Sequence, residues 1–152
     1  MRAKNASEKG FGSRAESPSD GLLDEGEVEE LALLLCELRE IASEGVPIIV
    51  EGAEDVRALA SIGISGKLYK ISGHGSLLNF IERFAGCAEV LILTDFDRAG
   101  EELAKFCERH LRGLGVKPLV EQRKRLRRLL RKEIKEISEM GRVVREYGLL
   151  GR

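Results

Sequence analysis

The chain has 152 residues, of which 43% are hydrophobic and 34% are charged. Its 25 Lys and Arg residues nearly balance its 26 Asp and Glu residues, so the formal net charge at pH 7 is −1. This length and hydrophobic content predict one domain with tails. The near-zero net charge excludes an overall charge large enough to select a nucleic acid or a membrane by itself, so only local clusters of charge can indicate a partner.

The cysteines and the hydropathy pattern predict a cytoplasmic protein. Cys36, Cys87 and Cys107 lack the spacing of a metal site and lie in apolar sequence, which favours buried thiols in a reducing compartment. No apolar run approaches the length of a membrane span, and the N-terminus lacks an apolar signal core. We therefore expect no membrane partner.

Two segments precede the predicted domain. Residues 1–20 are polar and rich in Gly and Ser, which predicts a disordered tail. Residues 21–45 are predicted to form an acidic N-terminal helix, because apolar residues recur at helical spacing and five acids lie in its first turns, where the helix dipole favours them. We expect this helix to pack on the domain through Leu31, Leu34, Leu35, Leu38 and Ile41, with its acids in solvent.

Residues 46–120 alternate short apolar runs with helix-like segments. The apolar runs predict strands at 47–50, 67–71, 89–94 and 116–120, and helical spacing predicts helices at 54–62, 77–84 and 98–111. Such alternation is typical of a Rossmann-like α/β fold with a four-stranded parallel sheet and helices on both faces.

Residues 121–152 are predicted to form a basic C-terminal helix, over about 121–140, and a tail. Two interpretations of its basic cluster stay open: a surface for phosphate backbones, or a solvated amphipathic helix that balances, and could pack against, the acidic N-terminal helix. The absence of interleaved aromatic residues argues against base stacking there. The cluster consists of Arg123, Lys124, Arg125, Arg127, Arg128, Arg131, Lys132 and Lys135.

Three acids follow predicted strands that are far apart in the sequence. Glu51 ends the first strand, and Asp95 and Asp97 end the third. Because parallel strands open on one edge of a sheet, these carboxylates are expected to converge there, and oxygen ligands favour a hard cation such as Mg²⁺. The alternative for the D-x-D pair is a helix cap beside a solvated acid.

The residues around these acids resemble the two signature motifs of the Toprim domain family. Residues 50–55 (Val-Glu-Gly-Ala-Glu-Asp) and 94–100 (Thr-Asp-Phe-Asp-Arg-Ala-Gly) carry the resemblance, which covers residues 46–120. The family includes topoisomerases of types IA and II, primases of the bacterial type, maturase nucleases and recombination-repair proteins. The whole chain resembles the small stand-alone Toprim proteins of archaea.

The resemblance assigns roles to particular residues. It implies that Glu51 acts as general acid or base or as a ligand of a second metal ion, that Asp95 and Asp97 bind Mg²⁺ or Mn²⁺, and that Asp55 has a structural or outer-shell role. Residues 72–75 match a glycine-containing loop near the phosphate, in which His74 is either a phosphate contact or a plain loop residue. The predicted nucleic-acid contacts are Arg98, Arg123, Arg127, Arg128 and Arg131.

The predicted function is Mg²⁺-dependent phosphodiester chemistry on RNA or DNA, as a nuclease or by nucleotidyl transfer, in RNA processing or in DNA repair or replication. The alternative is a Toprim module without catalysis that binds Mg²⁺ together with nucleic acid or a protein partner. A small-molecule phosphatase is a third interpretation that rests only on the D-x-D pair. Whether the chain is an enzyme stays open at this point, and no oligomeric state is predicted.

Overall fold

The computed structural model describes residues 23–151 and shows an α/β fold built on a four-stranded parallel sheet. Within this range the strands are β1 (Ile48–Val50), β2 (Leu68–Lys70), β3 (Glu89–Ile92) and β4 (Lys117–Leu119). The helices are α1 (Glu25–Ser43), α2 (Ala53–Ser61), α3 (Leu77–Glu82), α4 (Arg98–Gly113), α5 (Glu121–Leu130), the 3-10 helix η1 (Ile137–Glu139) and α6 (Met140–Glu146). The predicted fold class, with added N- and C-terminal helices, is confirmed. The predicted tail over residues 1–20 lies outside the described residues.

The sheet has the strand order β2-β1-β3-β4. β1 pairs in parallel with β2 and with β3, which places Ile48 beside Leu68 on one side and beside Leu91 on the other. β3 pairs in parallel with β4. The two central strands therefore lie side by side, and the residues that follow them leave the sheet at the same edge.

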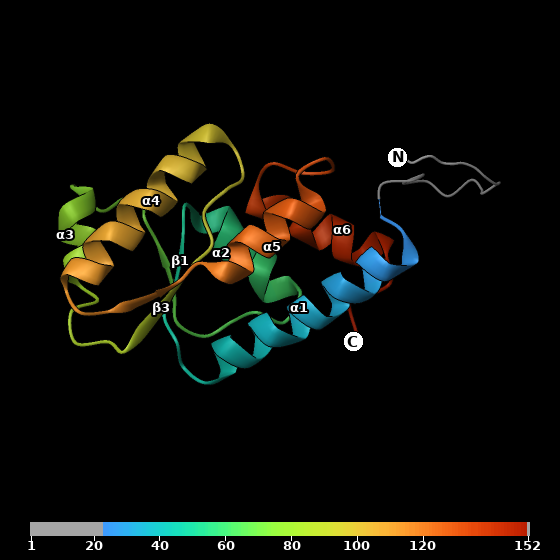
Figure 1. Cartoon of the computed structure of the whole chain (residues 1–152), viewed down its shortest axis with the longest axis horizontal. Coiled ribbons are helices and arrows are strands. Elements are labelled where there is room, and N and C mark those ends of the chain that lie inside the picture. The colour runs from blue at the N-terminus through green and yellow to red at the C-terminus, as the bar shows by residue number, and fades with distance from the viewer. Residues whose placement is uncertain (1–22, 152) are drawn as a thin grey trace.

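Helices cover both faces of the sheet (Figure 1). Side chains alternate between the faces along each strand, as the pleat requires. Ile49, Val90 and Ile92 pack with α3 and α4 in one core, while Val50 and Leu91 pack with α1, α2, α5 and α6 in the other. All of β1 and the apolar part of β3, residues 90–92, are buried, which explains why they appear in the sequence as continuous apolar runs.

The acidic helix α1 packs against the basic helix α5 through ion pairs. Glu37 accepts hydrogen bonds from Arg125 at 2.7 Å and from Gln122 at 2.8 Å, and Glu30 pairs with Arg128 at 2.6 Å. The expectation that the five acids in the first turns of this helix are only solvated is wrong for Glu30, and the alternative that the two helices pack against each other is confirmed. Part of the basic cluster is therefore neutralised within the protein.

The predicted single helix over residues 121–140 is wrong, because α5 ends at Leu130. A loop of residues 131–136 follows, and then η1 and α6 continue the chain. Tertiary hydrogen bonds replace helical ones in this segment: the Lys135 carbonyl accepts from the Phe96 N–H at 2.7 Å, and the Ile137 N–H donates to Asp95. The apolar residues that gave the helical spacing, among them Ile134, Ile137 and Met140, are buried in the core.

Two further expectations can be compared with the fold. Cys107 is buried, and burial raises the pKa of its thiol to about 12, but Cys36 lies exposed on α1, so its predicted burial is wrong. None of the helices within residues 23–151 is both long enough and apolar enough to cross a membrane.

Candidate active site at the carboxyl edge of the sheet

Glu51 and Asp95 meet where β1 and β3 end. Glu51 follows the last residue of β1 directly, and its Oε2 accepts a hydrogen bond of 2.9 Å from the main-chain N–H of Asp95. Burial raises the pKa of Glu51, with repulsion from Asp97 and Asp55 adding to this effect and the Asp95 N–H and Arg123 opposing it. The structure thus brings together the acids of the two motifs, 44 residues apart in sequence.

Asp95 is the most perturbed carboxyl group of the site. Its Oδ1 accepts a hydrogen bond of 2.8 Å from the main-chain N–H of Ile137. The pKa of Asp95 is raised to about 7, mainly by burial; the Ile137 N–H opposes this effect, and repulsion from Glu51, Asp55 and Asp97 adds to it. A carboxyl group in this state is stabilised by a proton or by a cation.

Asp97 begins helix α4 as its N-cap. Its Oδ1 accepts a hydrogen bond of 2.7 Å from the main-chain N–H of Gly100. The cap interpretation of the D-x-D pair is therefore realised by Asp97, although this hydrogen bond uses one of its two carboxylate oxygens.

Gly100 lets the start of α4 touch the main chain of Asp95. A Cβ at Gly100 would lie 2.6 Å from the carbonyl carbon of Asp95 and would clash with its oxygen. The buried Thr94 ties the same two segments together, because its Oγ1 donates to the Gly100 carbonyl at 2.7 Å. Glycine at this position therefore permits the close packing of two backbones.

Arg123 donates hydrogen bonds to the main chain of the D-x-D loop. It is only 4% exposed, its Nε donates to the Thr94 carbonyl at 2.9 Å, and its Nη2 donates to the Asp95 carbonyl and, at 3.0 Å, to Glu101. The guanidinium therefore faces the protein, and its geometry favours a positioning role over the predicted contact with nucleic acid. The sequence signal for this residue was its charge, which does not distinguish the two roles.

Asp55 has the structural surroundings of a helix-stabilising acid. It is 6% exposed, and its Oδ2 accepts a hydrogen bond of 2.9 Å from the Gly52 N–H at the start of α2. Burial raises the pKa of Asp55, with Glu136 and Glu54 adding to the effect of burial. Glu136, on the loop after α5, is an acid near the site that the sequence motifs do not include.

The other predicted nucleic-acid contacts fall into two groups. Arg127 and Arg128 are paired with acids, at 2.8 Å to Glu101 and 2.6 Å to Glu30. Arg98, the first residue of α4, and Arg131, which follows α5, are exposed. Lys132 and Lys135 are also exposed, on the 131–136 loop that is hydrogen-bonded to Phe96.

The donor chemistry of this edge fits a hard divalent cation. Glu51, Asp95 and Asp97 supply only carboxylate oxygens, and burial together with repulsion among the acids raises the pKa of Asp95, which a cation at this edge would counteract. Each carboxylate accepts a main-chain hydrogen bond, and within residues 23–151 no three His, Cys, Asp or Glu side chains form a ready-made metal cluster. The residues fit such an ion by chemistry, and small side-chain movements would be needed to hold it.

Comparison with known proteins places the chain in a family. The sequence profile of the Toprim domain matches residues 46–137. A UPF0292 protein of Methanosarcina acetivorans is 40% identical over 115 residues, which cover 74% of this chain and 78% of that protein. A UPF0292 protein of Thermococcus onnurineus is 40% identical over 116 residues, which cover 76% of this chain and 80% of the relative.

A solved structure has a similar fold. A protein from Aquifex aeolicus superposes on this chain with a TM-score of 0.61 at 25% identity, covering 72% of this chain and 96% of that one. The profile match covers more than half of the sequence and contains both acidic motifs together with Arg123 and Ile137. The resemblance found in the sequence, to Toprim proteins and in particular to small archaeal ones, is confirmed by these matches. This chain belongs to the Toprim domain family.

Proposed function

We propose that this protein carries out Mg²⁺-dependent phosphodiester chemistry on nucleic acid in the cytoplasm, by strand cleavage or nucleotidyl transfer. The observation that carries the proposal is the hydrogen bond of 2.9 Å between the Glu51 carboxylate and the main chain of Asp95. It fixes the acids of the two motifs at one sheet edge, which is where ligands of open α/β sheets bind.

The surroundings of the three carboxylates suit them to different roles. Asp95 and Asp97 would hold Mg²⁺, or Mn²⁺ in its place, and the ion would neutralise charge on the phosphate that reacts. Glu51, whose pKa is raised mainly by burial, is suited to accept or deliver a proton, or to bind a second ion. Arg123 and the Ile137 N–H position Asp95 without touching substrate.

Nucleic acid is the proposed substrate because exposed cations lie on the 131–136 loop and at the start of α4, the two segments next to the D-x-D pair. The 131–136 loop is anchored to the D-x-D loop through the Phe96 N–H and carries Arg131, Lys132 and Lys135. Arg98 extends this positive surface at the start of α4. A polynucleotide backbone offers phosphates to several such cations at once, whereas a small phosphate ester does not.

A second candidate function is a Toprim module without catalysis that binds Mg²⁺ and either nucleic acid or a protein partner. The observation in its favour is that all three carboxylates are engaged by main-chain N–H groups, so that the described residues contain no preformed metal cluster. This state would be expected if the carboxylates served the fold more than a reaction.

The deciding experiment is a cleavage assay on a panel of single- and double-stranded RNA and DNA with Mg²⁺ or Mn²⁺. Activity that depends on the metal and is lost in Glu51→Gln and Asp95→Asn supports the enzyme. The matched control is Glu40→Gln, a carboxylate-to-amide change on the exposed side of α1, which should retain full activity. Salt-dependent binding without turnover would favour the second candidate, and full activity in both site variants would refute the proposed chemistry.

A further inference from the structure

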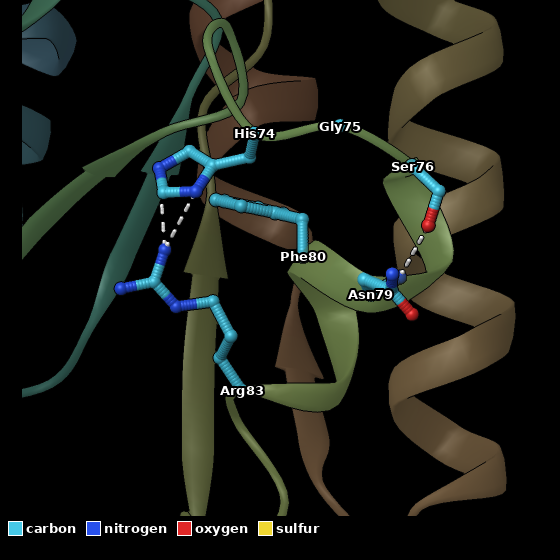
Figure 2. Close-up of a pocket in the computed structure, with 6 residues that line it drawn as sticks. All are labelled: His74, Gly75, Ser76, Asn79, Phe80 and Arg83. Atoms are coloured by element: carbon cyan, nitrogen blue, oxygen red, sulfur yellow. Dashed lines mark hydrogen bonds between the residues drawn. The ribbon is translucent and has the colours of Figure 1, made fainter.

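A second polar cluster lies at the same sheet edge, on the side of β2. The loop after β2 and the helix α3 enclose a hollow of about 420 Å³, lined by His74, Gly75, Ser76, Asn79, Phe80 and Arg83. Figure 2 shows His74 and Arg83 facing each other, with the Phe80 ring beside the imidazole. The hollow falls in the size range of small-molecule sites, about 300–1,000 Å³. None of these residues belongs to the acidic site described above.

Arg83 is held in place by aromatic rings and a histidine. Its guanidinium carbon lies 5.5 Å from the ring centre of Tyr69 and 5.9 Å from that of Phe80, and its Nη1 lies 3.1 Å from Nδ1 and 3.2 Å from Nε2 of His74. Within residues 23–151 no carboxylate pairs with this exposed arginine. A guanidinium has five donors in a plane, so most of them stay available to an anion.

A second cation strengthens the positive potential of this loop. Lys70, at the end of β2, donates from Nζ to the Ser72 carbonyl at 3.1 Å. Lys70 and Arg83 therefore both contact the 72–75 loop. A phosphate group, which presents several acceptor oxygens, matches this set of donors better than a carboxylate or a neutral ligand does.

The hollow is connected to the acidic edge by only a few residues. The Ser72 N–H donates to the Glu51 carbonyl at 3.0 Å, and the Ser72 Oγ lies 3.9 Å from where a Cβ at Gly52 would be. His74 is two residues further along the chain. Because β1 and β2 are neighbouring strands, a polynucleotide with one phosphate beside Glu51 and Asp95 would extend toward His74 and Arg83 if it crossed the ends of these strands.

We propose that His74 and Arg83 form a binding subsite for a phosphate of the nucleic-acid strand that flanks the reacting one. This subsite rests on the proposed function for its ligand. It lies on the sheet face covered by α3 and α4, whereas the 131–136 loop lies with the helices of the other face. The nucleic-acid strand would thus contact basic side chains on both sides of the acids: His74 and Arg83 on one side, and the 131–136 loop on the other.

The test uses the two histidines of the chain as reporters. Imidazole signals are followed by NMR in the Glu51→Gln protein with Mg²⁺, which keeps Asp95 and Asp97, so that binding is measured without cleavage, during titration with single-stranded RNA or DNA of about ten nucleotides. We expect the His74 signals to shift. The signals of His110, which stacks on Phe106 on α4 at 4.0 Å, should stay in place.

Variants then test the arginine. Arg83→Gln should lower the slope of log Kd against log salt by about 0.7 and weaken binding about fivefold at physiological salt, as expected for the loss of one phosphate contact. Arg83→Lys, which keeps the charge, should restore part of this loss. Arg109→Gln, the same change on an exposed residue of α4 far from its N-terminus, should leave binding unaltered.

Failure of the subsite differs from failure of the proposed chemistry. If His74 responds and Arg83→Gln weakens binding although the wild type cleaves nothing, the subsite stands and the catalysis fails. If the wild type cleaves but Arg83→Gln binds like Arg109→Gln, the subsite alone is refuted. An unmoved His74 signal, or shifts obtained equally well with inorganic phosphate as with the oligonucleotide, would also overturn it.

Discussion

Asp95→Asn should make the protein more stable at pH 8 when no divalent cation is present. In the fold the pKa of Asp95 rises from 3.8 to about 7, chiefly through burial. A raised acid pKa means that the folded protein keeps a proton that the unfolded chain has lost. Stability is therefore complete below about pH 4 and decreases as the pH rises through 7. Asparagine removes this titration and keeps an oxygen for the Ile137 N–H.

The size of the effect follows from the two pKa values. At about 1.4 kcal/mol per pH unit the interval corresponds to about 4 kcal/mol. Because Asp95 is only partly buried, solvent screening reduces this, and we expect a gain of about 2 kcal/mol at pH 8 and less than half of that at pH 5. Urea unfolding in the presence of a chelator measures both values, with Glu40→Gln as the control.

The same experiment tests the metal site. Adding Mg²⁺ at pH 8 should stabilise the wild type and leave the unfolding midpoint of Asp95→Asn unchanged, because binding to the folded state alone shifts the equilibrium. The reasoning is refuted if Asp95→Asn is no more stable than the wild type at pH 8 in chelator. An equal response of both proteins to Mg²⁺ would place the ion elsewhere.

Three further substitutions, one of them with a matched control, test the packing around the site by urea unfolding. Gly100→Ala should lower the free energy of unfolding by at least about 3 kcal/mol, because its Cβ would clash with the Asp95 carbonyl. The control Gly113→Ala, at the end of the same helix with no atom nearby, should be neutral or stabilising, and equal effects of the two would contradict the clash. Arg123→Gln should cost about 2–4 kcal/mol, because it leaves the Thr94 and Asp95 carbonyls without their donor. Arg128→Gln breaks only the exposed pair with Glu30 and should cost less than about 1 kcal/mol, so a larger loss here than at Arg123 would invert our assignment of roles.

The sheet and the meeting of the acids could be predicted from local sequence. Fully buried parallel strands require continuous apolar runs, and the parallel arrangement brings their carboxyl ends to one edge, so the runs before Glu51 and Asp95 were sufficient. The parallel topology was therefore enough to predict that the two motifs lie close together. Their chemical roles remain predictions, because neither burial nor hydrogen bonding identifies a substrate.

The segment after β4 could not be predicted in the same way. Its helix-forming residues and apolar spacing favour one long helix, yet the Phe96 N–H and the Asp95 carboxylate compete for the backbone around Lys135 and Ile137. Hydrogen bonds between distant segments leave no periodic signal in a sequence. For the same reason the sequence could not distinguish the buried Arg123 from the exposed basic residues around it, because burial depends on where the helix packs.

The hydrogen bond from Ile137 to Asp95 has a consequence for any excised or transplanted form of this unit. A fragment ending at Val120 would keep all four strands and both signature motifs, but it would lose Arg123, the Lys135 carbonyl and the Ile137 N–H. Its D-x-D turn would then have lost the partners that hold it from one side. We therefore expect that the smallest fragment able to fold by itself must include the residues that hydrogen-bond the D-x-D turn, even though the sheet is complete without them.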